Sequence, residues 1–218
     1  MLAKETVIKI SLFPSQLVTG VFCAQKGIFI MFHNFHLKEI IFLAIIGIVF
    51  GVIYLATGLL YNGLTILLTP FGYGPMANDI TIGIWCMAGP LAGFILRTPG
   101  APFLGEFLSA TVETLLGDQW GASNLLSGLV QGIGSELGFT VTFYRMYNWL
   151  TLVLTSTMMT ATTFAWDWFR NGYSHFAPTM LVTMLIVRWL SMFLFTGVLV
   201  KLIINLLNRA HVIQGIKQ

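Results

Sequence analysis

The chain has 218 residues, of which 56% are hydrophobic and only 9% are charged, and its formal net charge is +3. A soluble domain of ordinary composition is about 25% charged. This composition, together with a mean hydropathy of +0.85, excludes a disordered chain, a nucleic-acid-binding domain and most soluble enzymes, and predicts an all-α integral membrane protein.

The first 37 residues differ from the rest of the chain. They carry several charged side chains, and their one apolar stretch is too short to cross a bilayer and is not followed by a signal-peptide cleavage site. We interpret residues 1–37 as a poorly structured extension, with Met31 as an alternative start. The transmembrane domain is expected at residues 38–210 and a cytoplasmic tail at 211–218.

Apolar stretches near the length of about 20 residues that a helix needs to cross a bilayer recur along the rest of the chain. They cover residues 40–60, 80–96, 103–116, 125–143, 150–169 and 178–207. The third stretch is short and contains two glutamates. The dipeptide Gly89-Pro90 lies inside the second stretch and predicts a kink there. The sequence therefore predicts six transmembrane helices.

The charges in the predicted loops indicate the orientation of these helices. One side of the membrane receives five basic residues, which are Lys38, Arg97, Arg145, Arg209 and Lys217. The other side receives three acidic residues and one basic residue, which are Asp79, Asp118, Asp167 and Arg170. Because Lys and Arg are enriched in cytoplasmic loops, both termini are expected in the cytoplasm.

Four charged side chains fall inside the predicted helices: Glu106, Glu113, Glu136 and Arg188. A charge inside the bilayer costs at least about 2.5–3.5 kcal/mol on insertion scales, so each is a candidate functional residue. Arg188 and Glu136 are expected at comparable depth, where they form an ion pair or contact a ligand. Glu113 lies one turn from the outer end of its helix and is expected to bind a ligand, whereas Glu106 lies near the cytoplasmic end as a structural charge.

Aromatic and amide side chains accompany Glu113 at the predicted outer face. Gln119 and Trp120 lie in the loop after it, and Gln131 belongs to a stripe of polar and small residues on the fourth helix, from which Glu136 diverges. An aromatic face beside a carboxylate suits a flat cation or a protonatable heterocycle, although Trp120 also fits an interfacial anchor. Trp85 and Trp166 are further candidates for stacking.

Two other patterns bear on function. Gly47 and Gly51 have the small-xxx-small spacing that lets a second helix approach closely, either within the chain or from a partner. The sequence lacks a phosphate-binding Gly-Lys-Ser/Thr loop, a His-Glu-x-x-His motif and a Gly-x-Ser-x-Gly motif. The two cysteines, Cys23 and Cys86, match no zinc or redox spacing. We therefore expect no catalytic residues, no metal and no cofactor.

Three segments resemble a known family. Residues 89–106 read GPLAGFILRTPGAPFLGE, residues 113–121 read ETLLGDQWG, and residues 131–139 read QGIGSELGF. They are similar to the YkoE-type substrate-binding subunits, which are S components of energy-coupling factor (ECF) vitamin transporters. The resemblance covers approximately residues 38–208.

The resemblance implies a six-helix S-component bundle in a bacterial plasma membrane, with a substrate pocket near the outer face. It implies thiamine or its hydroxymethylpyrimidine precursor as substrate, and a transmembrane coupling subunit and two cytoplasmic ATPases as partners. Transport would proceed as the S component tips over in the membrane, driven by ATP hydrolysis in the partners. Gly47 and Gly51 would face the coupling subunit. The choice between the two substrates, and between dedicated and shared ATPases, stays open.

A second function class also stays open. A self-sufficient channel or ion-coupled transporter would use the four intramembrane charges as a relay and would need no partner. The preferred hypothesis is the vitamin-binding subunit, because carboxylate, amide and indole groups suit an aminopyrimidine ring.

Overall fold

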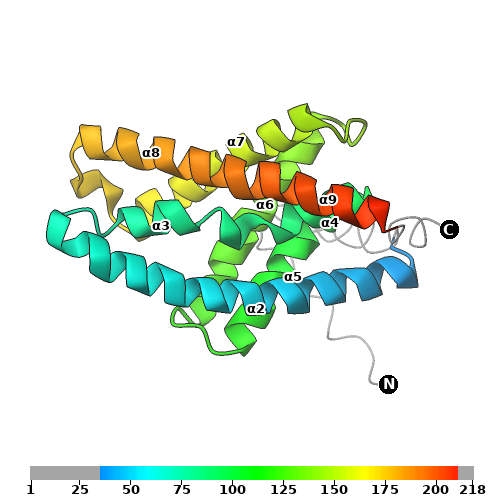
Figure 1. Ribbon diagram of the computed structural model, residues 1–218, viewed down its shortest axis with the longest axis horizontal. Coiled ribbons are helices and arrows are strands. Elements are labelled where there is room, and N and C mark those ends of the chain that lie inside the picture. Colours follow the sequence, from blue (N-terminus) through cyan, green and yellow to red (C-terminus); the bar gives the residue numbers. More distant parts are fainter. Residues whose placement is uncertain (1–34, 211–218) are drawn as a thin grey trace, which may run out of the picture. The chain divides into compact units, whose positions relative to one another are not determined.

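The computed structural model describes residues 35–210, and within that range it consists of helices and short connections, with no strand. The all-α prediction is therefore confirmed for this range. The helices are α2 (Leu37–Leu68), α3 (Met76–Thr81), α4 (Ala88–Leu96), α5 (Ala101–Leu115), α6 (Ala122–Val141), α7 (Trp149–Arg170), α8 (Pro178–Met192) and α9 (Val200–Arg209). Figure 1 shows their arrangement. Cys23, the predicted tail and nearly all of the predicted extension lie outside the described residues.

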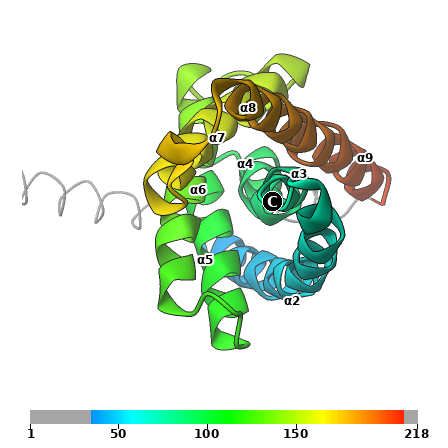
Figure 2. The same cartoon turned by 90° about the vertical axis from the view of Figure 1, so that its left-hand side faces the viewer.

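The longer helices pack around the two short ones. Helix α5 contacts α2, α4 and α6, and α7 packs between α6 and α8. Every residue of α4 is buried, and Figure 2 shows α3 and α4 enclosed by the longer helices.

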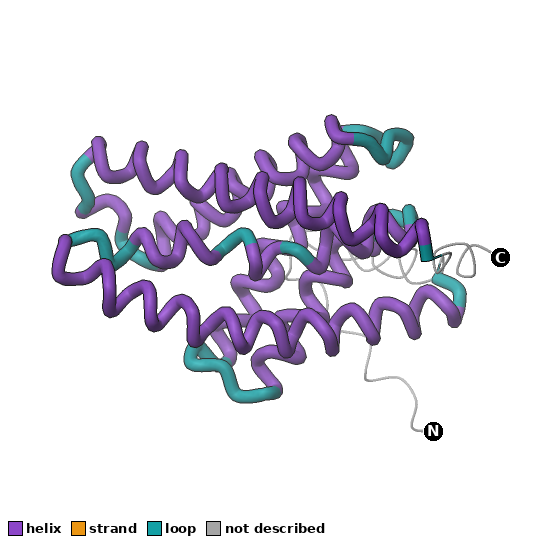
Figure 3. The backbone as a smooth tube through the Cα atoms, viewed as in Figure 1, coloured by secondary structure: helices purple, strands orange, loops and turns teal. Residues whose placement is uncertain are grey.

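The second predicted helix is broken, but not where the sequence indicated. The chain leaves the α-helical path between α3 and α4, where a short 3₁₀ turn η2 (Ile84–Cys86) intervenes, and Gly89-Pro90 falls in the first turn of α4. Figure 3 shows loop on both sides of this turn. Proline is tolerated in a first turn, because its missing N–H has no helical partner there.

Ser191 of α8 stabilises the broken backbone. Its hydroxyl donates to the carbonyl of Ile80 at 2.6 Å and accepts the N–H of Gly83 at 3.3 Å. A β-carbon at Gly83 would come within 2.5 Å of the Ser191 carbonyl oxygen. The break therefore needs both a glycine and a neighbouring hydroxyl, as expected for unwound backbone that is buried within protein.

Helices α8 and α9 form one continuous element, joined by the π-helical turn η4 (Phe193–Leu199). This element matches the sixth predicted stretch. Among the described residues, two helical stretches, Leu37–Phe71 and Pro178–Arg209, are long and apolar enough to cross a membrane, and Ile84–Leu96 is a shorter apolar one. Large apolar side chains on these helices, such as Ile48 and Leu202, face outward, whereas Glu106 and Arg188 are fully buried.

The close spacing of Gly47 and Gly51 serves packing within the chain. Both residues are buried against α5. A β-carbon at Gly47 would lie 3.2 Å from Leu108 Cβ, and one at Gly51 would lie 2.5 Å from Val112 Cγ1. The prediction that these two glycines face a coupling subunit is therefore wrong, because α5 already occupies the groove that they form.

Candidate functional site

A cavity of about 350 Å³ opens among the C-terminal ends of α2 and α7, helix α3 and the N-terminal half of α6. The connection after α7 closes one side of it. Four of the residues expected to bind substrate line this cavity: Trp85, Trp120, Gln131 and Trp166.

Aromatic rings form one wall of the cavity. The ring centroids of Trp85 and Trp120 are 5.3 Å apart in an edge-to-face arrangement, and Tyr61 lies 5.5 Å from Trp120 and 6.0 Å from Trp85. Trp166 contributes from α7. Such a wall suits a flat heterocyclic ligand, whose rings can lie against the faces and edges of the side chains.

Gln131 contributes a polar side chain to the cavity lining. It is only 8% exposed and lines the cavity, yet its side-chain amide has no hydrogen-bond partner within residues 35–210. Because the residue lines the cavity, water or a ligand there can pair with this amide. The amide offers one acceptor and two donors to a molecule in the cavity.

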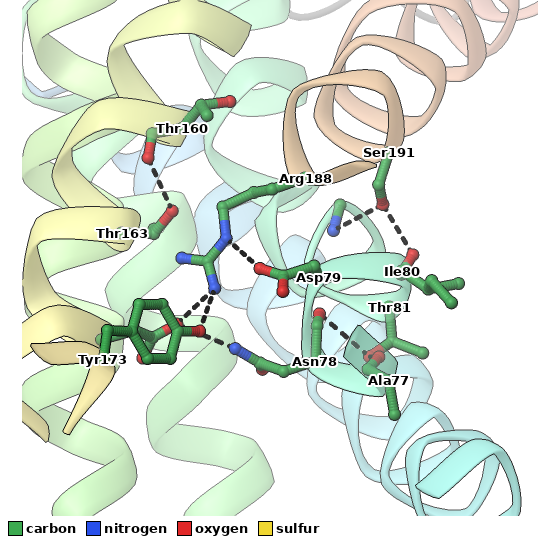
Figure 4. A network of polar contacts seen from close by, with 12 residues as sticks. Ala77, Asn78, Asp79, Ile80, Thr81, Thr160, Thr163, Tyr173, Arg188 and Ser191 are labelled. Carbon is green, nitrogen blue, oxygen red and sulfur yellow. Dashed lines mark hydrogen bonds and ion pairs between the residues drawn. The ribbon is translucent and has the colours of Figure 1, made fainter. Parts of the chain in front are cut away.

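A buried charged network borders the cavity (Figure 4). Arg188 of α8 donates through Nε to Asp79 Oδ1 and through Nη2 to Asp167 Oδ2, both at 2.6 Å. Nη2 also reaches the Tyr173 hydroxyl at 3.1 Å, and Asn78 Nδ2 donates to Asp167 Oδ2 at 2.8 Å. Burial raises the pKa of Tyr173, in the connection after α7, above its ordinary range, so this hydroxyl stays protonated.

Asp167 belongs both to this network and to the cavity lining. Its hydrogen bonds from side chains of the described region all go to Oδ2. The other oxygen, Oδ1, therefore remains available as an acceptor, while Arg188 and Asn78 hold the carboxylate in one orientation.

Comparisons with known proteins identify the family to which this fold belongs. A family model described as "ABC-type cobalt transport system, permease component" matches residues 38–164. The chain is 33% identical over 188 residues to the "Putative HMP/thiamine permease protein YkoE" of Bacillus subtilis (strain 168), covering 84% of this chain and 89% of that protein. A solved structure, "Crystal structure of an S-component of ECF transporter", superposes with a TM-score of 0.77 at 34% identity, covering 84% of this chain and 90% of that chain.

The chain belongs to the YkoE-type S components of ECF transporters. It is thus a membrane protein and a substrate-binding subunit of a transporter, and its relatives are transport components rather than enzymes.

In this S component, the ion pair expected between Arg188 and Glu136 does not form. Arg188 pairs instead with Asp79 and Asp167, both of which the sequence pattern assigns to outer loops. Asp79 lies in the short helix α3 and Asp167 in the last turn of α7, and both are buried. A polar residue near a helix end resembles a loop residue in the sequence. Elements that are distant in sequence can bury it, and such burial leaves no mark in the local sequence pattern.

Glu136 lies at the other end of α6 and does not line the cavity. Its carboxylate accepts the backbone N–H groups of Gly100 at 2.7 Å and Phe103 at 3.2 Å, and it also bonds to the Tyr144 hydroxyl. A carboxylate that accepts N–H groups at a helix start stabilises that helix. Glu136 therefore caps α5, and its prediction as a substrate ligand is wrong.

Glu113 and Gln119 lie near the cavity without lining it. Both oxygens of Glu113 are engaged, one by Trp85 Nε1 at 3.1 Å and the other by Asn124 Nδ2 at 2.8 Å. Glu113 thus orients Trp85 and Asn124, which line the cavity, without lining it itself. Gln119 is exposed and accepts from Asn62 at 3.0 Å. The acidic group that reaches the cavity is Asp167 instead.

Glu106 behaves as the structural charge that its position indicated. It is fully buried on α5, where it accepts from the Tyr54 hydroxyl and from the Gly89 N–H, each at 2.7 Å. Tyr54 in turn accepts the N–H of Ala88 at 3.0 Å. These bonds hold the first turn of α4 against α2 and α5.

Several lining residues were missed by the sequence analysis, among them Tyr61, Asn78, Ser127, Asp167 and Arg170. Ser127 follows the polar stripe of α6, so its helical spacing from Gln131 was an available signal. Tyr61 lies one residue beyond the predicted end of the first helix, which continues in the structure to Leu68. Nothing in the sequence pattern distinguishes Asn78 from other polar residues of a loop.

Proposed function

We propose that this S component captures thiamine or its hydroxymethylpyrimidine precursor in the cavity between α2, α3, α6 and α7. The observation that carries the proposal is a cavity walled by indole and phenol rings, to whose lining Gln131 brings an amide that has no hydrogen-bond partner among the described residues. The name of the YkoE relative, an HMP/thiamine permease, supports the same substrate class.

The chemistry of the lining suits an aminopyrimidine. The Gln131 amide can accept from an exocyclic amine and donate to the adjacent ring nitrogen, which is a two-point contact. Asp167 Oδ1 provides a second acceptor for an amine or a counter-charge for a cationic ring. Trp85 and Trp120 offer faces and edges for the flat rings.

We further propose that the substrate-binding domain, residues 38–210, crosses the plasma membrane six times with both termini in the cytoplasm. The crossings would be α2, α3 with α4, α5, α6, α7, and α8 with α9. The cavity lies at the end where α2 leads to α3, α5 to α6 and α7 to α8, and the exposed Arg97 and Arg145 lie in the connections at the other end. The cavity would therefore open outward.

Inward release would require a transmembrane coupling subunit and two cytoplasmic ATPases, with the S component tipping in the membrane as ATP is hydrolysed. This part of the proposal rests on membership of the S-component family. A relay for self-sufficient ion-coupled transport finds no support in the contacts. Glu106, Glu113, Glu136 and Arg188 each bond to a separate set of partners among the described residues.

Ligand titration of the purified, detergent-solubilised chain tests the proposal. Tryptophan fluorescence would be followed while thiamine, hydroxymethylpyrimidine, riboflavin and biotin are added separately. We expect saturable quenching by one or both of the first two, because Trp85, Trp120 and Trp166 line the cavity. Absence of quenching by both, from protein whose circular dichroism is helical, would overturn the substrate assignment.

Uptake into proteoliposomes tests the partner requirement. The chain alone should bind ligand without transporting it, and uptake should need the coupling subunit, the ATPases and ATP together. Uptake by the chain alone, driven by a proton or sodium gradient, would instead establish the self-sufficient transporter.

A further inference from the structure

One end of the cavity carries a cation that no carboxylate neutralises within the described part of the chain. Arg170 ends α7 and lines the cavity, and among residues 35–210 no carboxylate oxygen lies within 4.0 Å of its guanidinium. Asp167, one turn earlier, is already engaged by Arg188 and Asn78. Asp167 and Arg170 therefore line the same cavity from the same helix without forming an ion pair with each other.

Arg170 is held toward the cavity by hydroxyl groups of α6. Its Nη1 donates to Ser127 Oγ at 2.6 Å and its Nη2 donates to Ser123 Oγ at 3.1 Å. Ser127 is only 7% exposed and itself lines the cavity. Arg170 is itself exposed, so these two hydrogen bonds are what hold its guanidinium beside the cavity, and further N–H groups of its fork stay available.

Ser127 also has an unused hydrogen. Its oxygen accepts from Arg170 Nη1 and from Trp166 Nε1, the latter at 3.3 Å, so both lone pairs are occupied. Within the part of the chain that the structure describes, the Ser127 hydroxyl donates no hydrogen bond of its own. The buried Ser127 hydroxyl and the exposed Arg170 guanidinium therefore lie side by side, and both can donate to an anion.

We propose that this end of the cavity binds the phosphate group of a phosphorylated ligand, with Arg170 and Ser127 as its donors. A phosphate offers several anionic acceptor oxygens, and the guanidinium fork matches their geometry. The inference rests on the proposed function. Thiamine and hydroxymethylpyrimidine each carry a primary alcohol, so their phosphate monoesters combine the aromatic part that suits the indole wall with the anion that suits Arg170.

Comparing each alcohol with its phosphate monoester tests this inference. The dissociation constants of thiamine, thiamine monophosphate, hydroxymethylpyrimidine and its phosphate would be measured by calorimetry for the purified chain in detergent. The measured quantity is the ratio of the constants for the ester and for the alcohol. We expect Arg170→Gln to shift this ratio against the ester by about tenfold or more, because a charged hydrogen bond is lost. Arg170→Lys should shift the ratio less, and Ser127→Ala should shift it in the same direction as Arg170→Gln.

Arg145→Gln is the matched control. Arg145 is exposed in the connection between α6 and α7, at the other end of α6 from the cavity, and its loss should leave the ratio unchanged. An equal shift in both arginine variants would indicate a general charge effect and overturn the inference, as would an unchanged ratio in Arg170→Gln.

Two further outcomes distinguish failure of the phosphate site from failure of the substrate assignment. If neither alcohol nor ester binds the unaltered chain, the proposed function fails; if the alcohol binds and the ester is excluded, only the phosphate site fails. Arg170 is near the proposed membrane surface, where lipid headgroups offer the same phosphate chemistry. Binding to vesicles that contain phosphatidylglycerol, lost in Arg170→Gln while the ester ratio stays unchanged, would assign Arg170 to lipid and overturn the ligand site.

Discussion

Gln131 illustrates how much a single residue of the site followed from the sequence. Its helical spacing from Asn124 and Gly128 predicted a polar face, and the structure places Asn124 and Gln131 of that face on the cavity. Trp85, Trp120 and Trp166, which the sequence predicted to bind substrate, also line the cavity. The acids predicted to bind substrate do not, because the sequence predicts the depth of a carboxylate but not its partners. The oxygens of Glu113 accept hydrogen bonds from Trp85 and Asn124. The carboxylate that lines the cavity is that of Asp167 instead of Glu113.

The unpaired amide leads to a prediction about affinity and stability together. Replacing Gln131→Leu removes a buried group that a ligand would satisfy, so the dissociation constant for thiamine or hydroxymethylpyrimidine should rise by about tenfold or more. The melting temperature of the ligand-free protein should stay the same or increase, because Gln131 forms no hydrogen bond within the described residues and a leucine adds apolar surface. Gln119→Leu, at an exposed glutamine outside the cavity, is the control and should leave the affinity unchanged. Unchanged affinity in Gln131→Leu would remove this residue from the site.

At the scale of elements, the packing of helices explains two features that the sequence pattern left ambiguous: the closely spaced glycines of α2 and the break between α3 and α4. The small-xxx-small spacing on α2 was compatible with internal packing or with docking of a partner, and α5 decides the matter by filling the groove. The break between α3 and α4 depends in the same way on Ser191, which is distant in sequence and supplies the hydrogen bonds that the broken helix lacks. The kink predicted at Pro90 does not occur, because a proline in the first turn of a helix does not interrupt that helix.

The contact between α2 and α5 predicts a stability effect that one matched pair of variants can isolate. In Gly51→Ala the added β-carbon meets Val112, so we expect a loss of about 1–3 kcal/mol and a lower melting temperature in detergent. Gly63→Ala introduces the same change on the same helix, where no atom lies within 4 Å, and should be neutral or stabilising. Equal melting temperatures for the two variants would contradict the close packing of α2 against α5.

At the scale of the whole molecule, the membrane orientation is the property that most needs measurement. The helices expected from the sequence recur in the structure, yet only two described stretches are apolar and long enough to cross a membrane by those criteria alone. The proposed six crossings therefore depend on the alternation of basic and acidic connections and on the cavity opening at the acidic end.

Cysteine labelling tests this orientation. In a chain in which Cys23 and Cys86 have been replaced, Ser174→Cys lies in the exposed connection after α7 and Met146→Cys lies in the exposed connection after α6. A membrane-impermeant maleimide added to intact cells should label Ser174→Cys, and Met146→Cys should react only after permeabilisation. The reverse pattern would invert the proposed topology, and labelling of both from outside would contradict the number of crossings.

The sequence by itself determined the class of protein, the approximate positions of most helices and the polar residues of α6 that reach the cavity, because composition and helical periodicity are local properties. The tertiary structure decided which charges pair and which of them reach the cavity. Arg188 bonds to Asp79, 109 residues away, and to Asp167, 21 residues away. Nothing in the local pattern encodes such distances, since the pairing follows from how α3, α7 and α8 pack and from the cost of burying a charge without a partner.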